Sequence, residues 1–192
     1  MAATEQNLKL HLGIAEQGKL LALKGKHQAA LEHYREALRL AVSSRSPEVF
    51  FRHYTQCVME SLELSGELDS VLRYCNEAEQ HYQQLSSALA LVRRDRAENL
   101  QRRGCILLRQ HQLACAMASF EQALQLVAPD PLPLAHELTG WHRRGLTIGS
   151  RQLGDAQQRH QYFIVRKALV DPARAIPLPP AHRQGARAAI PF

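Results

Sequence analysis

The sequence is poor in the residues that build β-sheets. Aromatic residues make up 6% of the 192-residue chain and β-branched residues are few, whereas Ala, Leu, Gln, Glu and Arg are common. These preferences favour helices over strands. The apolar share of 45% is enough for a continuous core in one domain or a short repeat array. We therefore expect an all-α protein.

Long apolar runs and paired cysteines are also missing. No stretch approaches the roughly 18 apolar residues of a membrane span, and the first residues lack the pattern of a secretory signal. The expected compartment is therefore the cytoplasm. The four cysteines form no CxxC pair and have no histidine at zinc-finger spacing; they are Cys57, Cys75, Cys105 and Cys115. We interpret them as small, reduced core residues and expect neither a disulfide framework nor a metal site.

The chain contains no motif that carries a known chemistry. It has no HExxH, GxSxG, P-loop or GxGxxG sequence, and its ten histidines are not grouped with further donors at ligand spacing. The acidic pairs Glu32 with Glu36 and Glu60 with Glu63 lie on adjacent turns of expected polar helix faces, where solvated charge explains them. We expect no catalytic residue, no cofactor and no metal. An enzyme with an unrecognised site is the least supported alternative.

Positive charge is scarce in the first half of the chain and abundant in the second. Residues 1–90 carry nine Lys/Arg against eleven Asp/Glu, a net charge of −2, whereas residues 91–192 carry fifteen against seven, a net charge of +8. Fourteen of these fifteen cations are arginines, and the guanidinium fork suits carboxylates and phosphates. An acidic protein partner, nucleic acid and plain solvated helix faces are the three interpretations of this half.

Apolar residues recur at helical spacing along most of the chain, as in Ala30, Leu31, Tyr34 and Leu38. Clusters of glycine, serine and proline interrupt this pattern at intervals. We expect eight helices in four antiparallel pairs, over residues 4–24, 27–43, 47–64, 67–85, 88–110, 112–127, 133–151 and 155–170. They define a helical domain over residues 1–170.

The helical pattern stops after residue 170. Residues 171–192 contain five prolines and three arginines and have no amphipathic period, so we expect a flexible or extended, disordered tail. The run from Ile176 to Pro180 suits polyproline II, which leaves a docking peptide as the alternative. A third hypothesis is that this tail blocks a peptide-binding groove of the domain.

Helix-packing positions recur in the chain. In the stretch GKHQAALEHYREALRL and the helix before it, small residues stand where two successive helices would cross closely, with Gly18, Gly25, Ala30, Tyr34 and Ala37 at the key positions. This spacing resembles the tetratricopeptide repeat, whose period is about 34 residues. In that family Gly18 would be the close-packing glycine of the first helix, Gly25 the turn, and Tyr34 part of the packing face of the second helix.

Further units resemble the same repeat. The second is carried by Leu62, Gly66, Val71, Cys75 and Ala78, with Met59 in place of the first-helix glycine. The third is carried by Leu100, Gly104, Leu107, Ala116, Phe120 and Ala123, with His111 at the turn. A fourth fits Trp141, Gly145, Ile148, Val165, Ala168 and Pro172 if it carries an insertion. The resemblance covers about residues 11–172 and implies a short right-handed superhelix of stacked helix pairs.

In this family the first helix of each pair lines a concave groove that holds an extended peptide or a partner helix. The matching positions that we expect to bind a partner are Lys19, His53, Glu60, Arg102, Arg109, His142 and Arg143. Further positions expected to face the groove include Ala15, Glu16, Cys57, Glu63, Glu98 and Gln101. Arg102, Arg109 and Arg143 would suit an acidic peptide, since arginine binds carboxylates in two-pronged fashion. Of the five positions of the family's chaperone-tail clamp, only Arg102 matches.

The resemblance therefore predicts a non-catalytic scaffold or adaptor. It would bind an acidic, extended or helical segment of another protein, and it would self-associate where terminal helices stack on copies of themselves. The alternative is a nucleic-acid-binding or regulatory helical module that uses the Arg-rich C-terminal half. That half has little aromatic interleaving for stacking bases, which counts against the alternative.

Overall fold

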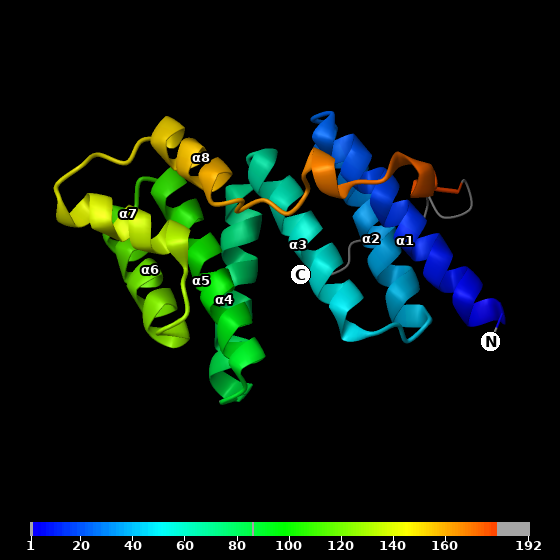
Figure 1. Cartoon of the computed structure of the whole chain (residues 1–192), viewed down its shortest axis with the longest axis horizontal. Helices are drawn as coiled ribbons and strands as arrows, with labels where there is room; N and C mark the ends of the chain where they lie inside the picture. The colour runs from blue at the N-terminus through cyan, green and yellow to red at the C-terminus, as the bar shows by residue number, and fades with distance from the viewer. Residues whose placement is uncertain (1, 86, 180–192) are drawn as a thin grey trace. The chain divides into compact units, whose positions relative to one another are not determined.

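All regular secondary structure in the described part of the chain is helical (Figure 1). The computed structural model describes residues 2–85 and 87–179, with side chains from residue 7 onward. These ranges contain no strand, which confirms the all-α prediction. The elements are α1 (Ala2–Leu23), α2 (His27–Ser43), α3 (Glu48–Leu64), α4 (Leu68–Leu85), α5 (Ala90–Arg109), α6 (Leu113–Val127), α7 (Pro133–Arg143), α8 (Ser150–Arg159) and the 3-10 helices η1 (Lys167–Leu169) and η2 (Pro172–Arg174). Within the same ranges, no helix combines the length and the apolar character that a bilayer span requires.

Contacts between residues divide the chain into two compact units. Of the described residues, unit 1 contains residues 2–67 and 164–179, and unit 2 contains residues 68–163. The predicted boundary at residue 170 does not coincide with this division. Residues 171–179 of the predicted tail belong to unit 1, because their main chain and aliphatic side chains find partners there. Residues 180–192 of that tail lie outside the described ranges.

Unit 1 is built on three helices, with α2 packed against both α1 and α3. The crossing of α1 and α2 is close because Gly18 has no side chain: a Cβ at this position would lie 2.7 Å from the ring of Tyr34. Tyr34 and the α2 alanines Ala30 and Ala37 are fully buried. Small side chains along one face of α2 thus allow the two backbones to approach each other.

Unit 2 repeats this arrangement in α5 and α6. A Cβ at Gly104 would lie 2.5 Å from the ring of Phe120, which is fully buried. The core continues through α7 and α8, where Leu138 and Leu153 are buried in the same cluster. In both units the aromatic residue follows the glycine by sixteen positions, so the predicted roles of Gly18, Tyr34, Gly104 and Phe120 are confirmed as helix-crossing contacts.

The turns after α1 and α5 have the same backbone conformation. Gly25 has a φ of 71°, and the N–H of the next residue, Lys26, donates to the carbonyl of Leu21 at 2.9 Å. After α5, His111 takes the glycine's place with a φ of 61°. A non-glycine residue in this left-handed region costs about 1–2 kcal/mol. The turn at Gly25 is confirmed, and His111 keeps the turn without glycine.

The last two helices differ from the prediction. α7 ends at Arg143 and not at residue 151, and α8 spans Ser150–Arg159 and not residues 155–170. Gly145 lies in the turn after α7, with a φ of 71°, and not at a helix crossing. Val165 belongs to the segment that packs on unit 1. The fourth helix pair as fitted through Gly145 and Val165 is therefore wrong.

Candidate functional site

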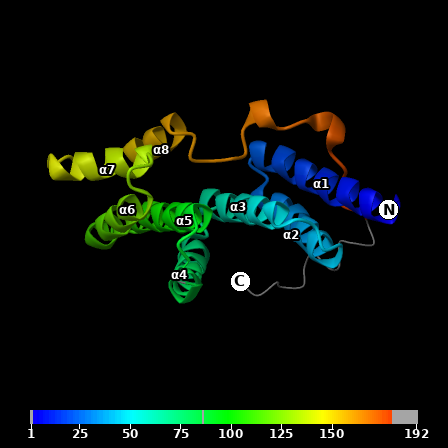
Figure 2. The same ribbon diagram turned by 60° about the horizontal axis from the view of Figure 1, so that its bottom comes forward.

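A largely extended segment of the chain lies against the helices of unit 1. Residues 164–179, orange in Figures 1 and 2, run beside α1 and contain η1 and η2. Residues that flank the two 3-10 helices have extended backbone angles. Main-chain N–H groups of this segment bond to four residues of the helices, which we call the docking face: Gly13, Glu16, His33 and Glu60.

Glu60 on α3 anchors the start of the segment. Its carboxylate accepts a hydrogen bond from the N–H of Ile164 at 2.7 Å and another from the N–H of Val165 at 3.2 Å. Glu60 is only 2% exposed. Two adjacent main-chain N–H groups thus compensate a buried negative charge that would otherwise be costly. Glu60, a predicted partner-binding residue, therefore binds the main chain of a distant segment of the same protein.

Glu16 on α1 holds the middle of the segment. One carboxylate oxygen accepts a hydrogen bond from the N–H of Asp171 at 2.5 Å, and the other accepts one from Lys19 Nζ at 3.0 Å. The side chains of Lys19 and Glu16 are 14% and 12% exposed. Lys19, also a predicted partner-binding residue, is thus paired with the carboxylate that binds the segment.

Gly13 is the point of closest approach between α1 and the segment. Its carbonyl accepts a hydrogen bond from the N–H of Ile176 at 2.9 Å. A Cβ at Gly13 would lie 2.5 Å from Cγ1 of Ile176 and 2.9 Å from the carbonyl oxygen of Arg174. The segment can therefore lie this near to the helix only because Gly13 has no side chain.

His33 on α2 binds the end of the segment. Its Nδ1 lies 2.7 Å from the carbonyl oxygen of Ala29, and its Nε2 lies 3.3 Å from the N–H of Leu178. A carbonyl only accepts, so Nδ1 carries the proton and Nε2 accepts from Leu178. The side chain of Leu178 is buried, with 5% exposed. Gly13 and His33 were not among the predicted site residues, because their role depends on a segment far away in the chain.

His53 on α3 lies close enough to Lys19 and Glu16 for their charges to influence it. Burial and, to a smaller extent, the positive charge of Lys19 lower the pKa of His53 to about 4, against the opposing negative charge of Glu16. His53 is therefore neutral at pH 7. The structure thus gathers the predicted residues Lys19 and His53 beside the docking residue Glu16.

A second histidine of unit 1, His11, is completely buried. Its Nδ1 lies 2.7 Å from the hydroxyl of Tyr54, and its Nε2 lies 3.1 Å from the hydroxyl of Ser46. Burial lowers its pKa. His11 ties α1 to α3 and to the turn before α3. His11 was not among the predicted site residues, although it stands three residues before Ile14 on the apolar face of α1.

In unit 2, the predicted arginines on α5 are covered by the end of the unit's own chain. Arg102 lies over the ring of Tyr162, 5.0 Å from its centre, and Arg109 donates to the amide oxygen of Gln157 at 2.8 Å. Arg143 on α7 makes an exposed ion pair with Glu121 at 3.6 Å. His142 is exposed in the last turn of α7. Each of the three predicted arginines therefore has a different intramolecular contact.

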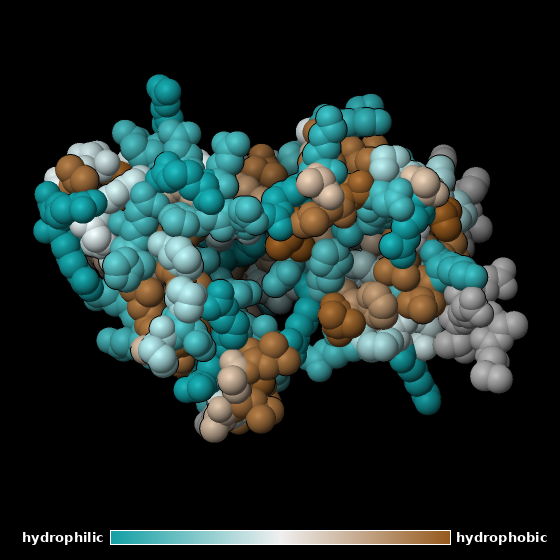
Figure 3. Space-filling model, viewed as in Figure 1, coloured by the Kyte–Doolittle hydropathy of each residue, from teal (hydrophilic) through white to brown (hydrophobic). Residues whose placement is uncertain are grey.

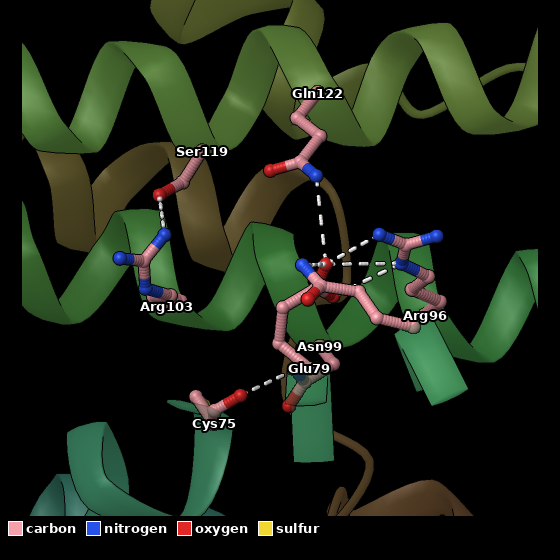
Figure 4. A network of polar contacts seen from close by, with 8 residues as sticks. Cys75, Glu79, Arg96, Asn99, Arg103, Ser119 and Gln122 are labelled. Atoms are coloured by element: carbon pink, nitrogen blue, oxygen red, sulfur yellow. Dashed lines mark hydrogen bonds and ion pairs between the residues drawn. The ribbon is translucent and has the colours of Figure 1, made fainter. Parts of the chain in front are cut away.

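A polar network joins α4, α5 and α6 (Figure 4). At its centre the carboxylate of Glu79 accepts hydrogen bonds from Arg96, and Gln122 of α6 approaches the same carboxylate at 3.5 Å. Nearby, Arg103 donates to the hydroxyl of Ser119 at 2.9 Å. Other arginines of unit 2 also bond to carboxylates or carbonyls of the chain: Arg94 to Glu98 and Pro131, and Arg159 to Glu137. Much of the positive charge of the Arg-rich half therefore stabilises the fold.

An open pocket of unit 2 lies between the loop before α7 and the end of α8. Prolines and leucines form much of its lining, and His136, Glu137, Arg159 and His160 supply the polar groups. Burial raises the pKa of Glu137, but hydrogen bonds from His160 and Arg159 outweigh it and lower that pKa overall. Among the residues that the structure describes, no three His, Cys, Asp or Glu side chains are grouped as metal ligands. In this pocket Glu137 thus pairs with both Arg159 and His160.

An apolar surface lies at the junction of α4 and α5. Leu85, Leu89 and Leu91 are 50%, 68% and 58% exposed. Figure 3 shows a brown patch where these two helices meet. Exposed apolar patches of soluble proteins often mark contacts with other macromolecules.

No family model, curated protein or solved structure matches this chain. The resemblance to the tetratricopeptide repeat therefore rests on the residues themselves. What the structure shows is the close crossing of helices at Gly18 with Tyr34 and at Gly104 with Phe120.

Proposed function

We propose that this chain is a non-catalytic protein-interaction module that binds an extended segment of another protein on the docking face of unit 1. The observation that carries the proposal is the binding of main-chain N–H groups by Glu60, whose buried carboxylate holds two of them side by side. Main-chain hydrogen bonds supply affinity for any extended chain, and pockets for alternate side chains supply specificity. The docking face offers main-chain hydrogen bonds and also side-chain pockets, since Val165 and Leu178 are buried at the two ends of the bound segment.

A tetratricopeptide-like scaffold is part of the proposal. The helix pairs α1–α2 and α5–α6 share the glycine-to-aromatic crossing that the family uses. The superhelical stacking of these pairs, the cytoplasmic location and self-association belong to the same proposal. The docking face agrees with it, since Glu16 and Glu60 stand at positions that correspond to the family's groove.

The expected partner differs from the one predicted from the sequence. The docking face contributes two carboxylates, Glu16 and Glu60, and the bound segment carries Arg166, Lys167 and Arg174 against Asp171 alone. An acidic peptide would bring further negative charge next to buried carboxylates. We therefore propose a neutral or basic segment as the ligand of this face.

A panel of unrelated 15-residue peptides would test the proposal. The full chain should bind a subset of them. When residues 164–179 are weakened as competitors by Ile176→Asp with Leu178→Asp, adding Glu60→Gln should weaken peptide binding at least tenfold, because the amide loses one of the two acceptor oxygens. Glu48→Gln is the matched control, since Glu48 is 77% exposed and pairs with Arg52 on the same helix. A panel without any ligand, or equal effects of both substitutions, would contradict the proposal.

Nucleic acid is the alternative ligand, favoured by the net charge of +8 in residues 91–192. Binding to phosphates weakens steeply with salt, whereas binding to a peptide main chain weakens only modestly. A mobility shift of duplex DNA at 50 and 200 mM salt separates the two. Tight binding that falls by a factor of about 1,000 over this range would favour the nucleic-acid alternative.

A further inference from the structure

The segment on the docking face is bound almost as a peptide would be. The contacts described above use its main chain at four places, and its buried side chains lie near its two ends, at Val165 and Leu178. Between these ends, Lys167 and Leu169 are exposed. The docking face therefore requires an extended backbone with an aliphatic residue at each end, and it tolerates variation in between.

Most contacts of the segment are separate from those that hold the three helices together, although the Cβ of His33 also borders the α1–α2 crossing, 3.1 Å from where a Cβ on Gly18 would stand. The α1–α2 crossing uses Gly18 and Tyr34, and His11 ties α1 to Tyr54 and Ser46. None of these residues is part of the docking face. Release of residues 164–178 would therefore leave these helix contacts in place and would expose the docking face to another chain.

We propose that residues 164–178 are an internal competitor for the docking face. The partner that displaces them is a neutral or basic extended segment with a β-branched residue at its start and two aliphatic residues, two positions apart, at its end. This inference rests on the proposed function and adds both the chemistry of the partner and the regulation of the site. The competitor belongs to the same chain as the docking face and binds it intramolecularly, so only a matching or abundant partner displaces it.

The competitor can be weakened without a change in the docking face. Ile176→Asp with Leu178→Asp places two charges where one side chain lies against Gly13 and the other is buried, so the end of the segment should dissociate. Leu169→Asp is the matched control, because Leu169 belongs to the same segment and is 58% exposed. Circular dichroism and thermal melting establish that each variant keeps its helices.

The probe is a fluorescein-labelled synthetic peptide with the sequence of residues 164–179, and the readout is its anisotropy. We expect the double variant to bind this peptide at least tenfold more tightly than the wild type does, and the Leu169→Asp variant to match the wild type. Equal affinity for the wild type and the double variant would overturn the inference. An equal gain in the Leu169→Asp variant would overturn it too, since the gain would then come from added charge.

Gly13→Ala gives a second measurement that does not depend on buried charges. Alanine favours the helix, but its methyl group would collide with Ile176, so the segment should be released and trypsin should cleave after Lys167 and Arg174 at least tenfold faster. Added to the double variant, Gly13→Ala should weaken peptide binding at least tenfold. Unchanged cleavage and unchanged peptide affinity would overturn the inference.

The two proposals fail in different ways. If the unrelated peptides bind the wild type through Glu60 but the competitor variants bind no more tightly, the proposed function stands and the internal competition is wrong. If neither the panel nor the peptide of residues 164–179 binds any variant, both are wrong.

Discussion

The ring of Tyr34 lies where a side chain at position 18 would otherwise stand: a Cβ built on Gly18 is 2.7 Å from Cε1 of Tyr34. The same relation exists between Gly104 and Phe120 in unit 2. In each case a flat aromatic ring packs directly on a helix backbone, which sets the distance between the two helices of a pair.

Gly18→Ala should destabilise the protein by about 1–2 kcal/mol, because overpacking at the crossing outweighs the better helix propensity of alanine. Gly140→Ala is the control: Gly140 is also helical, and a Cβ there would meet nothing within 4 Å. It should stabilise the protein by about 0.5–1 kcal/mol. Urea unfolding of the two variants measures both changes, and destabilisation by both would refute the packing argument.

Glu79→Ala should cost about 2–3 kcal/mol, because it removes the partner of Arg96, whose side chain is only 22% exposed, and the acceptor at the centre of the network. Glu121→Ala breaks an ion pair as well, but one whose side chains are 67% and 53% exposed. That change should cost less than about 0.5 kcal/mol. Chemical unfolding distinguishes the two, and similar costs would mean that the network contributes no more than a surface pair.

Acid should destabilise unit 1 before it protonates most carboxylates. His53 has a folded pKa of about 4, below its unfolded value of 6.5, so between these values the unfolded chain binds a proton that the folded chain does not. The stabilisation is complete above pH 6.5 and is lost as the pH falls toward 4, by up to about 3 kcal/mol. Burial lowers the pKa of His11 too, so this histidine also makes the folded chain less stable as the pH falls.

The measurement is the free energy of unfolding at pH 7 and at pH 4.5. His53→Gln should make the difference between the two free energies smaller. Part of the difference should remain, because His11 also has a lowered pKa in the folded chain. A difference that stays the same in His53→Gln would show that His53 is not protonated on unfolding in this range.

Glu60→Gln should release the start of the segment, because the amide offers one acceptor oxygen where the carboxylate offers two and a charge. The amide protons of Ile164 and Val165 should exchange with solvent roughly 10–100 times faster, since a hydrogen bond to a charged group contributes about 1.5–3 kcal/mol. Hydrogen exchange followed by NMR reports this directly. In Glu48→Gln both amides should exchange at the wild-type rate.

Local pattern was sufficient for the first six helices. α2 begins and ends at the predicted residues, and the predicted bounds of α1 and α3–α6 lie within two residues of the observed ones. The reason is that α2 and α4 have a strong apolar period and that clear breaks separate the helices, such as Gly25 with its positive φ. After Arg143 the pattern misled, since Leu146 and Ile148 continue a helical spacing through residues that form the loop before α8.

The candidate site was predictable only in part. Glu16 and Glu60, two of the positions predicted to face a common groove, both bind the segment of residues 164–179. What they bind was not predictable, since Ile164 is 104 residues away from Glu60 and no local pattern reports such a contact. For the same reason Gly13 stood out less in the sequence than Gly18, although both are glycines of α1 that permit close approach.

The separation between Glu60 and Ile164 also has a consequence during synthesis. Unit 1 is discontinuous, so a ribosome must add all of unit 2 before residue 164 exists. At about 5–20 residues per second, the nascent chain spends roughly 5–20 s with α1–α3 complete and the docking face without its own segment. Any partner present during translation therefore meets that face before the internal competitor has been made.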